Sequence, residues 1–458
     1  IIQLYFNTVP FSDNTYGIES ASLKFFNKHT SELSLEEAAV LVGMLKASHY
    51  YNPRIFPERS RLRRDVVLVQ MAKYNYLTQE EAENAKMQPL ILDYKNYSNN
   101  KGVAPYFREQ IRKDVSKILD TLKNKDGQKY NIYRDGLIVH TTLNYKMQQL
   151  AEEAMREHMA ELQKEHEKSY GNSAPWNKNK SILNDVIRKT ERYQNLKKEG
   201  ASDSEIFEKL ERTRPTELFQ YNGTETKNIS TIDSISHYLK FLNSGFLAVS
   251  PENGAVRAWV GGVDFRFFKY DHVSQSKRQV GSTFKPFVYT AALESGIDPC
   301  SYFSVREVTY EDGWTPSNSS SEGDDPNMNY NLKTALSQSM NTIAVKVLME
   351  TGIDNVINQA QEMGIKSDLP QVPSIALGTA SLNLGELTSA YTSFVNNGHY
   401  SKPYYITRIE DGNGNLLAEF KPEVSKTRAF SENTRKIMLN MMQATVNEGT
   451  ATRLRYKY

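Results

Sequence analysis

The chain has 458 residues, which is more than one ordinary domain needs, and its 39% hydrophobic residues are enough to fill two or three separate cores. Its 56 lysines and arginines nearly balance 54 acidic residues, and the net charge of +2 gives no argument for a nucleic acid as partner. The single cysteine, Cys300, excludes an internal disulfide framework, and no apolar run approaches the roughly 20 residues of a membrane span. We therefore expect a multidomain globular protein.

Residues 1–90 have the pattern of an all-helical block. The opening run, IIQLYFN, is typical of the middle of a helix, so we expect the chain to be a fragment whose beginning is missing. Ser34 followed by Glu37 predicts a capping box ahead of an amphipathic helix. Further helices are expected over Arg64–Met71 and in LTQEEAENAK, at 77–86.

The next two segments differ in charge and in periodicity. Residues 91–144 are expected to form a linker with a strand, because GLIVHTTLN at 136–144 is rich in β-branched residues. A long helix with periodic apolar positions is predicted directly after it. Residues 145–235 as a whole are polar and dense in charge, which predicts a solvated helical insertion.

The composition changes again in the last segment, residues 236–458. At 244–262, SGFLAVSPENGAVRAWVGG consists of two short alternating runs around a Pro-Glu-Asn-Gly turn, which predicts a β-hairpin. From there on, helical stretches mix with strand-like pieces such as YYITRIED and LLAEF. We expect an α+β domain with helices packed on an antiparallel sheet.

A serine and a lysine three residues apart occur three times, at Ser98 and Lys101, Ser274 and Lys277, and Ser282 and Lys285. Only Ser282 follows a glycine at the start of a helix with apolar residues behind it. There the two side chains share a face, free N–H groups at the helix N-terminus can stabilise an oxyanion, and desolvation can lower the pKa of the lysine. Ser282 is thus a candidate nucleophile with Lys285 as its base. The alternative is an N-cap serine beside a solvated lysine.

A second polar group, Ser339 and Asn341, lies in ALSQSMNTIAVKV, which is otherwise an apolar helical segment. Polar side chains in such a segment need partners. The hydroxyl of Ser339 could relay a proton between the lysine and a leaving amine, and the amide of Asn341 could both hold the lysine and orient a substrate carbonyl. Alternatively, both side chains simply bond backbone carbonyls.

Several motifs resemble those of class A, bifunctional penicillin-binding proteins. RQVGSTFKPFVYTAALESG at 278–296 resembles the nucleophile helix, and SQSMNT at 337–342 resembles the second motif. GWTPSN at 313–318, IALGTASLNLGELTSAYTSFVNNG at 375–398 and MMQATVNEGTA at 441–451 are similar to the flanking stretches. At the other end, residues 1–26 and 58–71 resemble the last two conserved stretches of the peptidoglycan glycosyltransferase.

The resemblance implies a fold for each segment. Residues 1–90 would be the all-α C-terminal portion of a lysozyme-like glycosyltransferase domain. An α/β linker with the helical insertion would follow, and residues 236–458 would be an α+β penicillin-binding transpeptidase domain of the serine β-lactamase type. The resemblance also implies substrate-binding roles for Gly281, Trp314, Asn318, Gly378 and Thr379, and leaves Asn7 and Arg64 as remnants of the glycosyltransferase site.

The sequence departs from the family pattern in three respects. No lysine-threonine/serine-glycine motif follows the second motif, so we expect the transpeptidase domain to be truncated before its third motif. We expect the catalytic glutamates of the glycosyltransferase to lie upstream of Ile1. Gln3 stands where the family has a glutamate.

The function implied by the resemblance is peptidoglycan synthesis outside the cytoplasmic membrane. Stem peptides and lipid II would be substrates, β-lactams would acylate Ser282, and a missing N-terminal anchor would hold the parent protein in the inner membrane. The transpeptidase needs no cofactor or metal, whereas the complete glycosyltransferase would use a divalent cation. Two alternatives remain open: a D,D-carboxypeptidase or β-lactamase-type hydrolase, and a non-catalytic penicilloyl-binding or wall-scaffolding protein.

Overall fold

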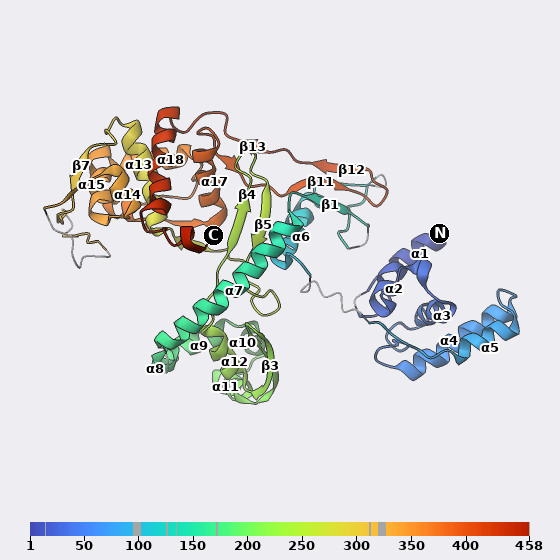
Figure 1. Ribbon diagram of the computed structural model, residues 1–458. Coiled ribbons are helices and arrows are strands. Elements are labelled where there is room, and N and C mark those ends of the chain that lie inside the picture. The colour runs from blue at the N-terminus through green and yellow to red at the C-terminus, as the bar shows by residue number, and fades with distance from the viewer. Residues whose placement is uncertain are drawn as a thin grey trace. The chain divides into compact units, whose positions relative to one another are not determined.

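The computed structural model describes residues 1–13, 15–94, 102–124, 127–133, 135–170, 173–310, 313–318 and 327–457. They form two compact units (Figure 1). Unit 1 consists of residues 1–102 and 115–137, and unit 2 of residues 103–114 and 138–458. Among the described residues, no helix has the length and the apolar character that crossing a membrane requires.

Unit 1 is helical. Its helices are α1 (Ile2–Thr8), α2 (Ile18–Phe26), α3 (Leu35–Met44), α4 (Pro57–Lys73) and α5 (Gln79–Met87), with a short 3₁₀ turn, η1 (Thr30–Glu32). The predicted start of α3 is confirmed, because a carboxylate oxygen of Glu37 accepts the backbone N–H of Ser34 at 2.9 Å. Phe11, Phe25, Leu41 and Met44 are fully buried and form the centre of the core. The prediction of a helical first block is confirmed.

Helix α6 (Pro105–Leu119) is divided between the units: its residues up to Asp114 fall in unit 2, and those from Val115 on fall in unit 1. After it, strand β1 (Ile138–Thr141) leads into the long helix α7 (Tyr145–Tyr170), as the sequence predicts. The segment that follows contains α8 (Pro175–Lys178), α9 (Lys180–Lys189), α10 (Glu191–Lys198), α11 (Asp203–Glu211) and α12 (Thr231–Leu239). It also contains an antiparallel hairpin, β2 (Arg214–Gln220) and β3 (Gly223–Ile229), which the prediction of a purely helical insertion missed. The hairpin was missed because neither strand alternates: β3 has no buried residue, and the two buried residues of β2, Leu218 and Phe219, are adjacent.

The rest of unit 2 combines helices with small antiparallel sheets. The strands of this part are β4 (Phe246–Val249), β5 (Val256–Val260), β6 (Lys277–Gln279), β7 (Tyr302–Ser304), β8 (Asn329–Asn331), β9 (Ser381–Asn383), β10 (Ser401–Lys402), β11 (Ile406–Glu410), β12 (Leu416–Glu419) and β13 (Glu423–Val424). β4 and β5 pair in the predicted hairpin, while β1, β11 and β12 form one three-stranded sheet. β6 pairs with β9, β7 with β8, and β10 with β13.

Helix α13 (Lys285–Glu294) is accompanied by further helices in this part. They are α14 (Leu332–Ser337), α15 (Asn341–Thr351), α16 (Ile353–Glu362), α17 (Leu384–Val395), α18 (Glu432–Asn447) and α19 (Leu454–Lys457), with the 3₁₀ turns η3 (Gly281–Phe284) and η4 (Pro373–Leu377). Eight of the ten residues of α13 are buried, and α15, α16 and α18 pack against it. Figure 1 shows α15 and α18 on either side of α13 in this part of the chain. The first residue of this central helix is therefore fixed by the largest core of the chain.

Candidate active site

The turn that carries Ser282 is held from two sides. Val280 and Gly281 donate backbone hydrogen bonds to the carbonyls of Ala380 and Gly378, both at 3.0 Å, which continues the pairing of β6 with β9. On the other side, the hydroxyl of Tyr391 donates to the carbonyl of Thr283 at 2.7 Å. Ser282 itself is exposed in η3, directly before α13. Its hydroxyl is thus solvent-accessible on a fixed backbone.

Lys285 is the first residue of α13 and its side chain is fully buried. Its Nζ donates to three acceptors: the carbonyl of Ser339 at 2.5 Å, the hydroxyl of Ser339 at 3.1 Å and Oδ1 of Asn341 at 2.8 Å. None of these acceptors carries a charge, so no carboxylate offsets the loss of hydration. Burial lowers the pKa of Lys285 to about 8. The interpretation of Lys285 as a solvated surface residue is therefore wrong.

Ser339 lies in a break between two helices and not inside one helix, contrary to the sequence prediction. Helix α14 ends at Ser337, α15 begins at Asn341, and Ser339 has a φ of +57°. This left-handed conformation is uncommon for a residue with a Cβ. The occurrence of Ser337, Ser339 and Asn341 within five residues was the available signal, since Ser and Asn favour helix ends and turns.

The hydroxyl of Ser339 bridges the two motifs. Its Oγ lies 3.0 Å from Oγ of Ser282 and 3.1 Å from Nζ of Lys285. A neutral lysine can accept a proton as well as donate one, and each hydroxyl can do both. The three groups can therefore move a proton from Ser282 to Lys285 through Ser339.

Asn341 and Asn318 form the neighbouring part of the site. Oδ1 of Asn318 accepts the backbone N–H groups of Asn341 at 2.8 Å and of Thr342 at 3.2 Å, so it caps the N-terminus of α15. The side-chain amide of Asn341 donates to the carbonyl of Ser317 at 2.9 Å. These contacts place the predicted GWTPSN stretch beside the second motif. Asn318 positions Asn341, and its predicted contact with substrate stays a prediction.

Gly281 and Gly378, both predicted from sequence, lie against each other. Their φ angles are +57° and +73°, and a Cβ on Gly378 would come within 1.9 Å of the carbonyl oxygen of Gly281. Only glycine fits at Gly378. Thr379 follows it and is exposed near the same turn. Trp314 packs against Tyr310, with ring centroids 5.9 Å apart, and its role toward a substrate stays a prediction.

The other two S-x-x-K pairs do not form such a site. Ser98 and Lys101 lie outside the described residues. The hydroxyl of Ser274 donates to Oδ2 of Asp271 at 2.9 Å, and Lys277 is an exposed residue of β6. These contacts agree with the choice of Ser282.

In unit 1, the two predicted remnant residues differ in their surroundings. Asn7 is exposed on α1. Arg64 is fully buried, and its guanidinium donates to Oδ1 of Asp65 at 2.9 Å and to the carbonyls of Gln88 at 2.7 Å and Lys86 at 2.8 Å. These contacts give Arg64 a structural role at the end of α5, and a role for either residue in a glycan site stays a prediction.

Three contributors to the site could not be found from sequence spacing. Tyr391 holds the nucleophile turn from 108 positions away. Gln338 donates to the carbonyl of Glu448 at 3.0 Å, and Thr450 donates its N–H to the carbonyl of Ser337 at 3.1 Å. The segment that follows α18 thereby supports the break that contains Ser339. All three lie in stretches that resemble family motifs, but none of these residue types is diagnostic by itself, so the sequence assigned them no role.

Three family descriptions match consecutive parts of the chain. "Transglycosylase" matches residues 1–72, "Penicillin-binding protein middle domain" residues 171–242, and "Penicillin binding protein transpeptidase domain" residues 244–458. The chain belongs to the bifunctional penicillin-binding proteins. The family and the fold class predicted from sequence are confirmed. The middle domain covers most of the segment that the sequence motifs left without a relative.

The relatives include penicillin-binding protein 1A of Escherichia coli, which is 27% identical over 93% of this chain and 53% of its own length. Penicillin-binding protein 1A of Aquifex aeolicus is 28% identical over 99% of this chain and 62% of its own length. The crystal structure of penicillin-binding protein 1A from Haemophilus influenzae has a similar fold, with a TM-score of 0.68 and 24% identity over 100% of this chain and 75% of that one. The chain thus spans less than two thirds of the length of these curated relatives.

Proposed function

We propose that the domain around Ser282 is a serine D,D-transpeptidase that cross-links the stem peptides of peptidoglycan. The observation that carries this proposal is the continuous contact from Ser282 through Ser339 to Lys285, at 3.0 and 3.1 Å, with the lysine fully buried. A nucleophile, a relay hydroxyl and a base with a pKa of about 8 together make acyl transfer feasible near neutral pH. Membership of the penicillin-binding family supports the same reaction.

In the acylation step, Oγ of Ser282 attacks the carbonyl carbon of the penultimate D-alanine. As the new C–O bond forms, the proton of Ser282 passes to Ser339, and the proton of Ser339 passes to neutral Lys285. The backbone N–H of Ser282, in the turn that opens α13, would stabilise the negative charge that develops on the carbonyl oxygen. When the C–N bond breaks, the proton returns through Ser339 to the amine of the leaving D-alanine.

In the second step, an amine of a neighbouring stem peptide attacks the acyl-enzyme. A C–N bond forms, the bond to Oγ of Ser282 breaks, and the proton lost by the amine restores the serine hydroxyl. Asn341 donates to a backbone carbonyl and accepts from Lys285, so in this proposal it keeps the lysine in place and orients the peptide at the edge of the site. β-Lactams would acylate the same serine, since they resemble the D-Ala-D-Ala end.

We further propose that the parent protein polymerises glycan from lipid II through the transglycosylase domain to which residues 1–72 belong. It would act on the periplasmic side, anchored in the inner membrane. The complete domain would use a divalent cation for this reaction. Within the described ranges, no cluster of three or more His, Cys, Asp or Glu side chains has the arrangement of a metal site, so no step is assigned to an ion here.

The test is the intact mass of the chain after incubation with a β-lactam, beside a Ser282→Ala variant. We expect a single adduct of the drug's mass on the parent and none on the variant. A folded parent without an adduct would overturn the assignment of Ser282. Supplying a D-Ala-D-Ala peptide with and without an acceptor amine then separates the alternatives: a cross-linked product indicates a transpeptidase, a hydrolysed peptide indicates a carboxypeptidase, and a stable acyl-enzyme without turnover indicates a scaffold.

A further inference from the structure

A basic cavity lies in the middle domain, which precedes the segment of Ser282 in the chain. It is formed by α10, the end of α11 and the first residue of β2, and its volume is about 650 Å³. A small core of Ile187, Tyr193, Ile206 and Leu210, all buried, fixes α10 and α11 relative to each other. The walls of the cavity are therefore set by packing, even though its lining side chains are exposed to solvent.

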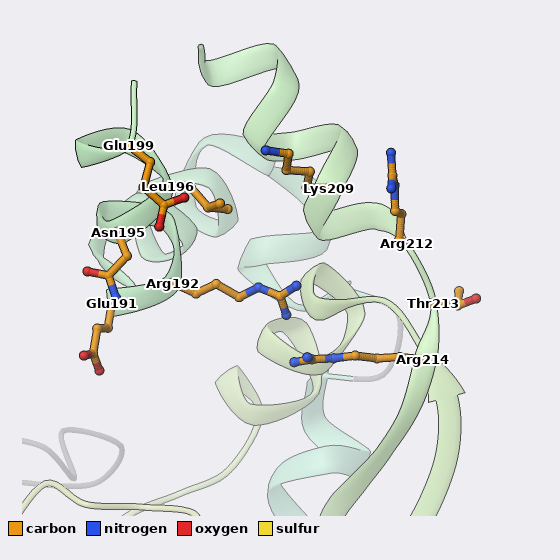
Figure 2. A pocket seen from close by; sticks show the side chains of 9 residues that line it. All are labelled: Glu191, Arg192, Asn195, Leu196, Glu199, Lys209, Arg212, Thr213 and Arg214. Atoms are coloured by element: carbon orange, nitrogen blue, oxygen red, sulfur yellow. The ribbon is translucent and has the colours of Figure 1, made fainter. Parts of the chain in front are cut away.

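Four cationic side chains line this cavity, against two carboxylates (Figure 2). They are Arg192 from α10, Lys209 from α11, and Arg212 and Arg214 around the start of β2. In Figure 2 the guanidinium groups of Arg192 and Arg214 extend toward each other from opposite walls, with Lys209 above them. The carboxylates belong to Glu191 and Glu199 on the α10 side. The lining thus carries two more positive than negative charges. Three of the four cations stand on the wall formed by α11 and the start of β2.

These positive charges are poorly neutralised by the protein. Among the described residues, neither Lys209 nor Arg214 has a carboxylate within 4.0 Å. Arg212 pairs with Glu208 at 3.4 Å, and both side chains are largely exposed to water. Arg192 is oriented by Thr231, the first residue of α12, whose hydroxyl accepts from Nη1 at 2.9 Å. Within the described part of the chain this guanidinium forms no ion pair, so its other N–H groups can donate to a ligand. Arg192 and Arg214 extend toward each other in Figure 2, whereas Arg212 extends away from them.

We propose that this cavity binds a phosphate-bearing ligand. Guanidinium forks bind phosphate oxygens with two parallel hydrogen bonds, and the tetrahedral group offers oxygens to cations arriving from several directions. A planar carboxylate is satisfied by a single guanidinium and leaves the other cations unmatched. The phosphate has two possible sources, a soluble phosphate or diphosphate and the headgroup of an anionic phospholipid. Nothing in this proposal depends on the transpeptidase assignment.

The first experiment measures binding of inorganic pyrophosphate to the whole chain by isothermal titration calorimetry at low ionic strength, where charge interactions are least screened. The test variant is Arg192→Gln with Arg214→Gln. The control variant is Lys189→Gln with Lys198→Gln, which removes two exposed cations of α9 and α10 that do not line the cavity. We expect the test variant to bind at least about tenfold more weakly and the control to bind as the parent does. Circular dichroism and thermal unfolding check that both variants keep the parent fold.

The second experiment uses vesicles of phosphatidylglycerol with the same three proteins, in a flotation assay. If the test variant loses binding of pyrophosphate and the parent does not bind vesicles, the ligand is a soluble phosphate. If the parent binds vesicles and the test variant does not, the ligand is a lipid headgroup. Equal weakening in the test and control variants would overturn the proposal, since it would mean that only overall charge matters. Absence of arginine-dependent binding in both assays would overturn it as well.

Discussion

Gly378 lies directly against the backbone of Gly281, so that a Cβ on Gly378 would come within 1.9 Å of the carbonyl oxygen of Gly281. The contact joins the segment after η4 to the turn that presents Ser282. Because the obstructing atom is backbone, a side chain at 378 can be accommodated only by moving the nucleophile turn. The geometry of the acylation site therefore depends on the absence of one methyl group.

We expect Gly378→Ala to slow acylation of Ser282 by about a hundredfold, since a displacement of the order of 1 Å costs about that much in rate. The matched control is Gly414→Ala, because Gly414 has a similar φ, +82°, but no atom within 4 Å of its Cβ position. That variant should lose only about 1 kcal/mol of stability from backbone strain and acylate normally. Acylation rates with a chromogenic β-lactam and thermal unfolding measure both effects. Similar acylation rates in the two variants would contradict the steric argument.

The hydroxyl of Ser339 can be separated from the backbone strain at this residue. Ser339→Gly removes the hydroxyl but also relieves the strain of a φ of +57°, so the variant should be at least as stable as the parent. If Ser339 relays the proton, acylation should nevertheless slow by about 10²–10⁴-fold. The measurement is the acylation rate beside the unfolding temperature. A stable variant that acylates at the parent rate would exclude the relay.

The acylation rate should rise with pH, because only neutral Lys285 can accept a proton and burial lowers its pKa to about 8. Between pH 6 and pH 8 the neutral fraction, and hence the rate, should increase about fiftyfold and then level off. The pKa in the folded state lies below the ordinary 10.5, so the unfolded chain binds more protons between about pH 8 and 10.5. The free energy of unfolding contributed by Lys285 therefore rises with pH across that window. Lys285→Arg, which stays charged, should remove the acylation activity at every pH. An acylation rate of the parent that does not change with pH would argue against Lys285 as the base.

Asn318 caps α15 from outside the helix, through bonds of 2.8 and 3.2 Å to the N–H groups of Asn341 and Thr342. We expect Asn318→Ala to lower the free energy of unfolding by about 1 kcal/mol, as for other lost caps, and to slow acylation by displacing Asn341. Asn318→Asp keeps an acceptor at the same place and should restore stability. Chemical denaturation of the three proteins tests this. If Asn318→Asp were as unstable as Asn318→Ala, the cap would not be the source of the effect.

The buried Arg64 should matter for the stability of unit 1. In Arg64→Met the carbonyls of Lys86 and Gln88 and the carboxylate of Asp65 lose their donor, so we expect a loss of about 3 kcal/mol. Arg61→Met, which removes an exposed arginine paired with Glu58 on the same helix, should change stability by no more than about 0.5 kcal/mol. Hydrogen exchange of the peptides that cover α4 and α5 reports on this unit alone. Equal protection in the two variants would contradict the structural role of Arg64.

The sequence alone determined the features that depend on a few neighbouring residues. The capping box at Ser34 and Glu37, the hairpin over 244–262, and the strand before α7 were predicted because capping, turn and alternation signals act over three to ten positions. For Ser282 and Lys285 the local signal left an N-cap serine beside a solvated lysine open, and the choice depended also on the second motif and on the family resemblance. The hairpin of β2 and β3 was missed because neither strand has the alternation of apolar and polar residues that signals a strand.

Only the tertiary structure decided how the site is assembled. Lys285 meets Ser339 and Asn341 across 54 and 56 positions, and the support from Gly378 and Tyr391 comes from still farther along the chain. The break at Ser339 and the cap from Asn318 likewise arise where segments pack against one another. Local propensity acts between neighbouring residues, whereas the contacts that bury a lysine and place two hydroxyls within 3.0 Å depend on how a whole core packs.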